Sequence, residues 1–241
     1  MEKTRLCSVN TKMFVSSSCR SKEDIRKSVQ IADIEETDFT TDANTFSSWV
    51  TKNTNFKDVT KEITSETEFV LANVIIFQSN WPNSVPRMTI YNSFNYTQDV
   101  KYEARLLELP LKSEVKLVIV VPNEVDVVQS LFKTLAGQGL DAAVRSIQPL
   151  FTTTCECYPP KVDVTSSLVY GEKTSLLANT TTIQYGNLVV NEHGTNIKVM
   201  TCFYSPSNRQ VSVDAVQGSE QPFYLAVLYH DVPLFIGQFT Q

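Results

Sequence analysis

The chain offers few side chains that could form a catalytic centre. Its only two histidines, His193 and His230, fall in separate predicted turns. A Ser-His-Asp site needs a histidine beside a nucleophile, and a metal site needs several ligands brought together. Neither pattern occurs here, so we expect no catalytic residue, no metal and no other cofactor. Of the functions considered, a hydrolase has the least support.

The cysteines give neither a disulfide framework nor the spacing of a zinc site. There are five of them: Cys7, Cys19, Cys155, Cys157 and Cys202. An odd number without regular spacing argues against a disulfide scaffold. Cys155 and Cys157 form a C-x-C step with no second pair, and we interpret them as small residues on one face of a strand. Cys202 falls in a predicted loop, where its thiol would be open to oxidation if it is exposed.

A strand, a turn and a second strand-like segment follow one another from Leu188 to Val199. An apolar run ends in Asn191-Glu192-His193-Gly194, after which Thr195, Ile197 and Val199 alternate with Asn196 and Lys198. This alternation predicts a strand with Ile197 and Val199 inward. Gly194 is the position where the backbone can take an unusual φ.

Length and composition indicate one globular domain. The 241 residues are 42% hydrophobic, enough for a sizeable core and too many for disorder. The net charge is -5, and no basic cluster exceeds a pair, which argues against nucleic acid as a partner. No apolar run is long enough to span a membrane, and residues 1–20 do not read as a secretory signal. The sequons at Asn95 and Asn179 matter only if the chain is secreted.

Hydrophobic patterns predict the elements that position this segment. Phe69 to Phe77 is apolar on both faces, which predicts a central strand whose Asn73 amide is hydrogen-bonded if buried. Thr41 or Asp42 is expected to cap a helix that buries Phe46, Trp49, Val50 and Asn53 along one face. The remaining expected elements are an edge strand at 32–39, hairpins at 104–121 and 223–239, two helices at 125–147 broken by Gly137 to Gly139, an extended stretch at 150–164 and an exposed loop at 201–219.

Six stretches, taken in order, resemble the serpin family. They are Phe46 to Val50 with Thr54-Asn55, Leu71 to Trp81, Ala104 to Pro110, Pro160 to Val162, the Glu192-x-Gly194-Thr195 step, and Pro222-Phe223 with Gly237 and Phe239. The resemblance implies an α+β fold with a mixed large central β-sheet, a second packed sheet, few helices and an exposed reactive-centre loop. It implies a single serpin-like domain over 1–241, expected to lack the family's N-terminal helices and to be a minimal member of the family, similar to the shortened serpins of poxviruses.

The mechanism implied by the resemblance is suicide inhibition of a protease. A protease attacks the exposed loop as a substrate, and the cleaved loop then enters the large sheet as a new strand. The hinge of this loop is assigned to five residues: Glu192, Gly194, Thr195, Ile197 and Val199. Serpin inhibitors carry small residues after the threonine, whereas overpacking by Ile197 and Val199 is expected to cost about 1–3 kcal/mol per site. The region where the sheet opens is assigned to Trp81, Asn73 and Gln184, the last at the position of the family's histidine.

The scissile bond is expected within Asn208, Arg209, Gln210 and Val211. Counting forward from Glu192 places it at Asn208-Arg209, and counting back from Phe223 moves it towards Val211. Arg209 would suit a trypsin-like protease, and a solvated loop arginine is the equally weighted alternative.

Two functions stay open at this point. The first is a serpin-type protease inhibitor, not an enzyme, with a target protease as its partner. The second is a non-inhibitory serpin-fold protein that binds a host or other partner protein, as an immune modulator or decoy. We expect a monomer, with no membrane partner, in the cytoplasm of a host cell, or outside the cell if it is secreted by another route or a leader was removed.

Overall fold

The computed structural model describes most of the chain. The described ranges are residues 7–20, 33–41, 45–56, 63–81, 90–92, 95–99, 101–124, 128–146, 148–149, 155–157, 162–170, 180–205, 222–230 and 232–239, with residues 23, 25, 27 and 59. Backbone proximity divides the chain into two compact units. Unit 1 comprises residues 1–77, 165–187 and 197–215, and unit 2 comprises residues 78–164, 188–196 and 216–241. The expectation of a single domain stays a prediction.

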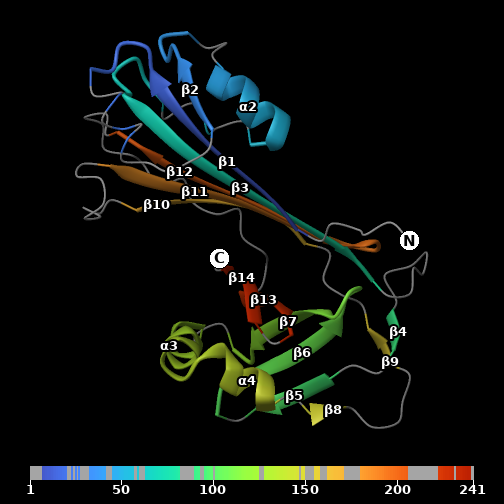
Figure 1. Cartoon of the computed structure of the whole chain (residues 1–241). Coiled ribbons are helices and arrows are strands. Elements are labelled where there is room, and N and C mark those ends of the chain that lie inside the picture. Colours follow the sequence, from blue (N-terminus) through green and yellow to red (C-terminus); the bar gives the residue numbers. More distant parts are fainter. Residues whose placement is uncertain are drawn as a thin grey trace. The chain divides into compact units, whose positions relative to one another are not determined.

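A six-stranded sheet is the largest element of the structure (Figure 1). Its strands, in spatial order, are β10 (Val162–Tyr170), β11 (Thr181–Asn191), β12 (Gly194–Tyr204), β3 (Phe69–Asn80), β1 (Cys7–Ser16) and β2 (Ile34–Thr37). β1 pairs antiparallel with β3 and parallel with β2, so the sheet is mixed, as expected. The expected edge strand is confirmed, because β2 ends the sheet.

β3 is a central strand because both of its faces are apolar. Val70, Ala72 and Val74 are fully buried in a core on one face. On the other face, Phe69 and Leu71 pack with residues of β1 and β2. The prediction of a central strand at Phe69 to Phe77 is therefore confirmed, and the strand continues to Asn80.

Helix α2 (Thr45–Asn53) covers the first of these faces. Phe46 and Val50 are buried on it, as predicted, and Trp49 packs against the same core. The ring of Phe14 on β1 meets the ring of Phe46 edge-on, with centroids 5.2 Å apart. Such an aromatic pair contributes about 0.5–1.5 kcal/mol beyond its buried area. Of the two predicted caps, Asp42 lies outside the described residues.

Unit 2 contains a second six-stranded sheet and a small two-stranded one. The larger has the order β14 (Val232–Phe239), β13 (Phe223–Tyr229), β7 (Val115–Pro122), β6 (Ala104–Pro110), β5 (Asn95–Asp99) and β8 (Gln148–Pro149), and the smaller pairs β4 (Ile90–Asn92) with β9 (Cys155–Cys157). The strand pairings described in these sheets are all antiparallel. Both predicted hairpins, β6–β7 and β13–β14, are confirmed.

Helices α3 (Val128–Gln138) and α4 (Leu140–Ser146) cover one face of this second sheet. Leu131, Leu135 and Ala143 are buried against side chains of β6, β7 and β13. Gly139 separates the helices with a φ of +81°, a conformation that glycine adopts readily. The predicted break is confirmed. None of the helices within the described ranges is long and apolar enough to cross a membrane.

Candidate strand-insertion site

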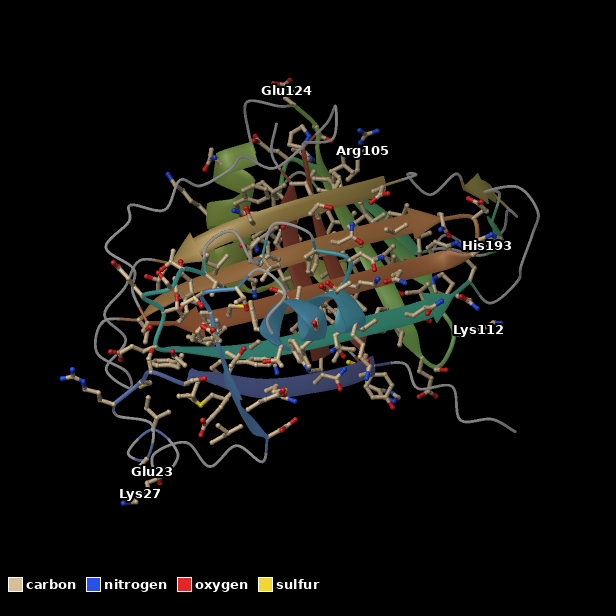
Figure 2. The ribbon with its side chains drawn as sticks, turned by 90° about the horizontal axis from the view of Figure 1, so that it is seen from above. Glu23, Lys27, Arg105, Lys112, Glu124 and His193 are labelled. Atoms are coloured by element: carbon tan, nitrogen blue, oxygen red, sulfur yellow. The ribbon has the colours of Figure 1, made fainter. Side chains whose placement is uncertain are left out.

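The segment after Gly194 is a full-length strand of the large sheet. β12 lies between β11 and β3, and Figure 2 shows the three strands side by side. Its first residue, Gly194, lies against Ser79 near the end of β3. Just beyond its last residue, the Ser205 amide donates to the carbonyl of Phe69 at the start of β3, across 3.2 Å. β12 therefore runs antiparallel to β3 along the whole of that strand.

This placement corrects two expectations from the sequence. Thr201 was expected to begin a long exposed loop, but Thr201 to Tyr204 belong to β12. Cys202 was expected in that loop and instead is 2% exposed. The physical reason is that Met200, Cys202 and Tyr204 alternate as a second apolar set, which extends the strand by burying it. The reactive-centre residues Asn208, Arg209, Gln210 and Val211 lie outside the described residues.

A tight turn joins β11 to β12 and is held by one side chain. The Asn191 side-chain oxygen accepts hydrogen bonds from the amide of His193 at 2.9 Å and from the amide of Gly194 at 3.2 Å. Asparagine suits this position because its short side chain can bond to the backbone two residues later. The turn was expected from the sequence but the role of Asn191 was not, although an asparagine at the end of a strand is a typical turn signal.

Gly194 is required by the close approach of β3. Its φ is +153°, and a Cβ atom there would lie 2.6 Å from the Cα of Asn80 and still closer to the carbonyl oxygen of Ser79. Backbone atoms cannot move aside cheaply, so any larger residue would displace the turn from β3. The expectation of an unusual backbone at Gly194 is confirmed.

Trp81 fastens the turn to the end of β3. Its indole nitrogen donates to the carbonyl of Asn191 across 2.8 Å, and its amide donates to the carbonyl of His193 across 3.2 Å. The side chain is 2% exposed. We call Trp81, Asn191, His193 and Gly194 the hinge clamp.

The β6–β7 turn supports the hinge clamp. The amide of Lys112 donates to the carbonyl of Asn80 across 3.0 Å, and the Ser79 hydroxyl donates to the carbonyl of Lys112 across 3.4 Å. Figure 2 labels Lys112 and His193 at the same end of the sheet. The end of β3 is thus held from both sides by backbone hydrogen bonds.

The histidines show no catalytic arrangement. His193 is 81% exposed and lies 3.8 Å from Glu192, while His230 lies 2.8 Å from Glu114 on a different turn. Within the described ranges, no group of three or more metal-ligating side chains comes together.

The buried face of β12 changes along the strand. Ile197, predicted inward, is 5% exposed, whereas Val199 is only half-buried. Met200, Cys202 and Tyr204 point to the opposite face and join the core beneath α2. Ile197 is therefore accommodated, but the largest burial comes from residues that were not assigned to the site.

The residues assigned to sheet opening have different partners. The Gln184 amide donates to the Thr201 hydroxyl across 3.4 Å, so Gln184 contacts the inserted strand. Asn73 is half-buried, and its amide donates to Thr11 of β1 across 2.6 Å, which confirms that it is hydrogen-bonded. Trp81 belongs to the hinge clamp instead, so the structure does not bring these three residues into one cluster.

Burial suppresses the chemistry of the thiol in β12. Desolvation raises the pKa of Cys202 to about 12, because its thiolate would lie in an apolar core. Cys202 is thus an inert thiol while β12 is in the sheet, whereas Cys7 is exposed.

The curated proteins to which this chain is similar include serpins. No protein-family model matches the chain. It is 28% identical to human Serpin B4, in an alignment that covers 56% of this chain and 42% of that protein. It is 24% identical to antitrypsin of Bombyx mori, with 89% of this chain and 67% of that protein covered. The chain thus spans less than half the length of Serpin B4.

Solved structures with a similar fold include serpins after cleavage of their loop. Cleaved Serpin 42Da matches with a TM-score of 0.72 and 21% identity, over 98% of this chain and 75% of that one. A loop-inserted structure of a cleaved ovalbumin mutant matches with a TM-score of 0.62 and 16% identity, over 96% and 74% of the two chains. A likeness at these identities concerns the fold alone.

Proposed function

Because the chain belongs to the serpin family and has the serpin fold, we propose that it inhibits a protease by inserting its cleaved reactive-centre loop into the large sheet. The observation that carries this proposal is β12, an eleven-residue strand lying between β11 and β3. In this arrangement the sheet has already accepted the whole hinge segment.

Burial of β12 supplies the driving force. Met200, Cys202 and Tyr204 are almost fully buried beneath α2. Burying a large apolar side chain contributes roughly 1.5–3 kcal/mol relative to leaving it exposed. Overpacking at Ile197 and Val199 was expected to oppose insertion, but Ile197 fits and Val199 is half-buried. The balance favours insertion.

The chemical step belongs to the target protease. Its nucleophile would bond to the scissile carbonyl carbon within residues 208–211, and the peptide C–N bond would break to leave an acyl-enzyme. The freed segment would then follow β12 into the sheet and carry the attached protease with it. Arg209 fits a trypsin-like target, and this specificity is part of the proposal.

The test is formation of a complex that survives SDS. We expect incubation with trypsin-like or caspase-type proteases to give such a complex with the natural chain and with Met200→Leu, which keeps the apolar volume. Met200→Glu should be cleaved without trapping the protease, because a carboxylate would have to enter the core beneath α2. Cleavage of the natural chain with no stable complex, and no gain in heat stability of the cleaved form, would refute inhibition.

A specific surface favours the second candidate, a serpin-fold protein that binds a partner. Val232, Leu234 and Ile236 on β14 are 59%, 44% and 55% exposed and alternate along an edge strand. Exposed apolar stripes of this kind are typical of protein-binding surfaces. If Leu234→Ser abolishes capture of a partner while no protease complex forms, this second function is the correct one.

A further inference from the structure

Two side-chain oxygens at the start of β12 are buried with no hydrogen-bond partner among the described residues. Thr195 is 2% exposed, and its hydroxyl oxygen has no hydrogen-bond partner among the described residues. The side-chain oxygen of the next residue, Asn196, is also buried and unpartnered there. We call Thr195 and Asn196 the hinge pair. They immediately follow the hinge clamp.

Two hydroxyl groups further along the chain have partners. The Thr201 hydroxyl accepts from Gln184, and the Ser205 hydroxyl accepts from the amide of Glu68 across 2.6 Å. The hinge pair lies where the strand enters the sheet, next to the hinge clamp. From this placement we propose that the hinge pair opposes the first step of strand insertion and sets how readily β12 enters the sheet.

The physical reason is the loss of water. Outside the sheet, both side-chain oxygens are hydrated. Inside it, each loses its water and gains no partner, which lowers the equilibrium constant for insertion by roughly fivefold to a hundredfold for each group. This cost falls at Thr195 and Asn196, before Met200, Cys202 and Tyr204 can be buried. Insertion therefore begins with the desolvation cost of the hinge pair, and the favourable burial of apolar side chains follows only later.

This inference rests on the proposed insertion mechanism and adds a determinant of its rate. If the strand enters the sheet too readily, it inserts before a protease is bound and the protein can no longer trap one. If it enters too slowly, the protein is hydrolysed as a substrate. The hinge pair shifts the balance towards the second outcome. Its removal should therefore speed insertion and raise the stability of the inserted form.

The experiment measures how often β12 leaves the sheet in the chain after its loop has been cleaved. Cys202 is buried on β12, so its reaction with iodoacetamide reports strand opening, while exposed Cys7 reports the unhindered rate and buried Cys19 reports opening elsewhere. Labelling is quantified for each peptide by mass spectrometry. Thr195→Val removes an unpartnered hydroxyl, and Thr201→Val, the matched control, removes a hydroxyl that accepts from Gln184.

We expect Thr195→Val to slow Cys202 labelling by about fivefold to a hundredfold. Thr201→Val should leave that labelling unchanged or accelerate it. Asn196→Leu provides a second variant and should also slow it. Equal labelling in Thr195→Val, Asn196→Leu and the natural chain would overturn the proposal, and so would slowing by Thr201→Val of the same size.

The proposed function and the hinge pair can fail separately. Slower labelling with no protease complex in any variant would uphold the hinge pair and refute inhibition. A stable complex with unchanged labelling would uphold inhibition and refute the hinge pair.

Discussion

The indole nitrogen of Trp81 donates a hydrogen bond to the backbone carbonyl of Asn191 across 2.8 Å. This bond joins the residue that follows β3 to the last residue of β11, on either side of the place that β12 occupies. With the amide of Trp81 bonded to the carbonyl of His193, one residue fixes the turn from which the inserted strand departs. The hinge clamp therefore holds the turn from which β12 begins.

Trp81→Phe should loosen this turn while preserving its aromatic packing. The change leaves the carbonyl of half-buried Asn191 without its indole donor, and we expect the free energy of unfolding to fall by about 1–3 kcal/mol. Urea denaturation followed by circular dichroism measures this loss. An unchanged unfolding midpoint would mean that the bond contributes nothing to stability.

Asn191→Ala should destabilise the β11–β12 turn. It removes the oxygen that accepts from the amides of both His193 and Gly194, and the expected loss is about 1 kcal/mol. Asn191→Asp keeps an acceptor oxygen and should restore most of the stability. Equal losses for Ala and Asp would show that the side-chain oxygen is not what holds the turn.

Gly194→Ala should block insertion. The added methyl group would collide with the backbone of Ser79 and Asn80, and φ of +153° is unfavourable for alanine. We expect loss of the SDS-stable complex, with cleavage of the loop retained. Gly137→Ala is the matched control, because a methyl group there meets nothing within 4 Å and favours helix α3. Trapping by Gly194→Ala at the natural yield would contradict the role of this close approach.

Cys202 should make stability fall at alkaline pH. Its pKa is raised from 9.0 to about 12, so the folded chain holds this proton more tightly than the unfolded chain. The resulting contribution is fully present below pH 9 and is lost as the pH rises towards 12, by about 1.4 kcal/mol per pH unit. The measurement is the difference in unfolding free energy between the natural chain and Cys202→Ala from pH 8 to pH 10.5. A difference that stays constant over this range would place the thiol in contact with water.

Much of the fold follows from local sequence patterns. Phe69 to Phe77 is apolar on both faces and can only be a central strand, and Phe46 and Val50 lie one helical turn apart and so pack together. These features depend on periodicity within one element. The turn at Gly194 was also predictable, because glycine after Asn191-Glu192-His193 permits the required backbone.

The rest depends on contacts between distant segments. Met200 to Tyr204 is apolar enough to be a strand, but it becomes one only because it pairs between β11 and β3. The partner of Trp81 is the backbone carbonyl of Asn191, far along the chain. Every residue type has such a carbonyl, so the sequence does not identify this partner. Likewise, Gln184 and Thr201 come together only because β12 is inserted.

The most direct test of the account is amide hydrogen exchange of residues 194–204, resolved by peptide. The account predicts that, once the loop has been cleaved, this segment exchanges as slowly as Phe69–Asn80 of β3, because both are interior strands of one sheet. Exchange of 194–204 within seconds in the cleaved chain, with β3 still protected, would show that the segment does not enter the sheet and would contradict the insertion mechanism.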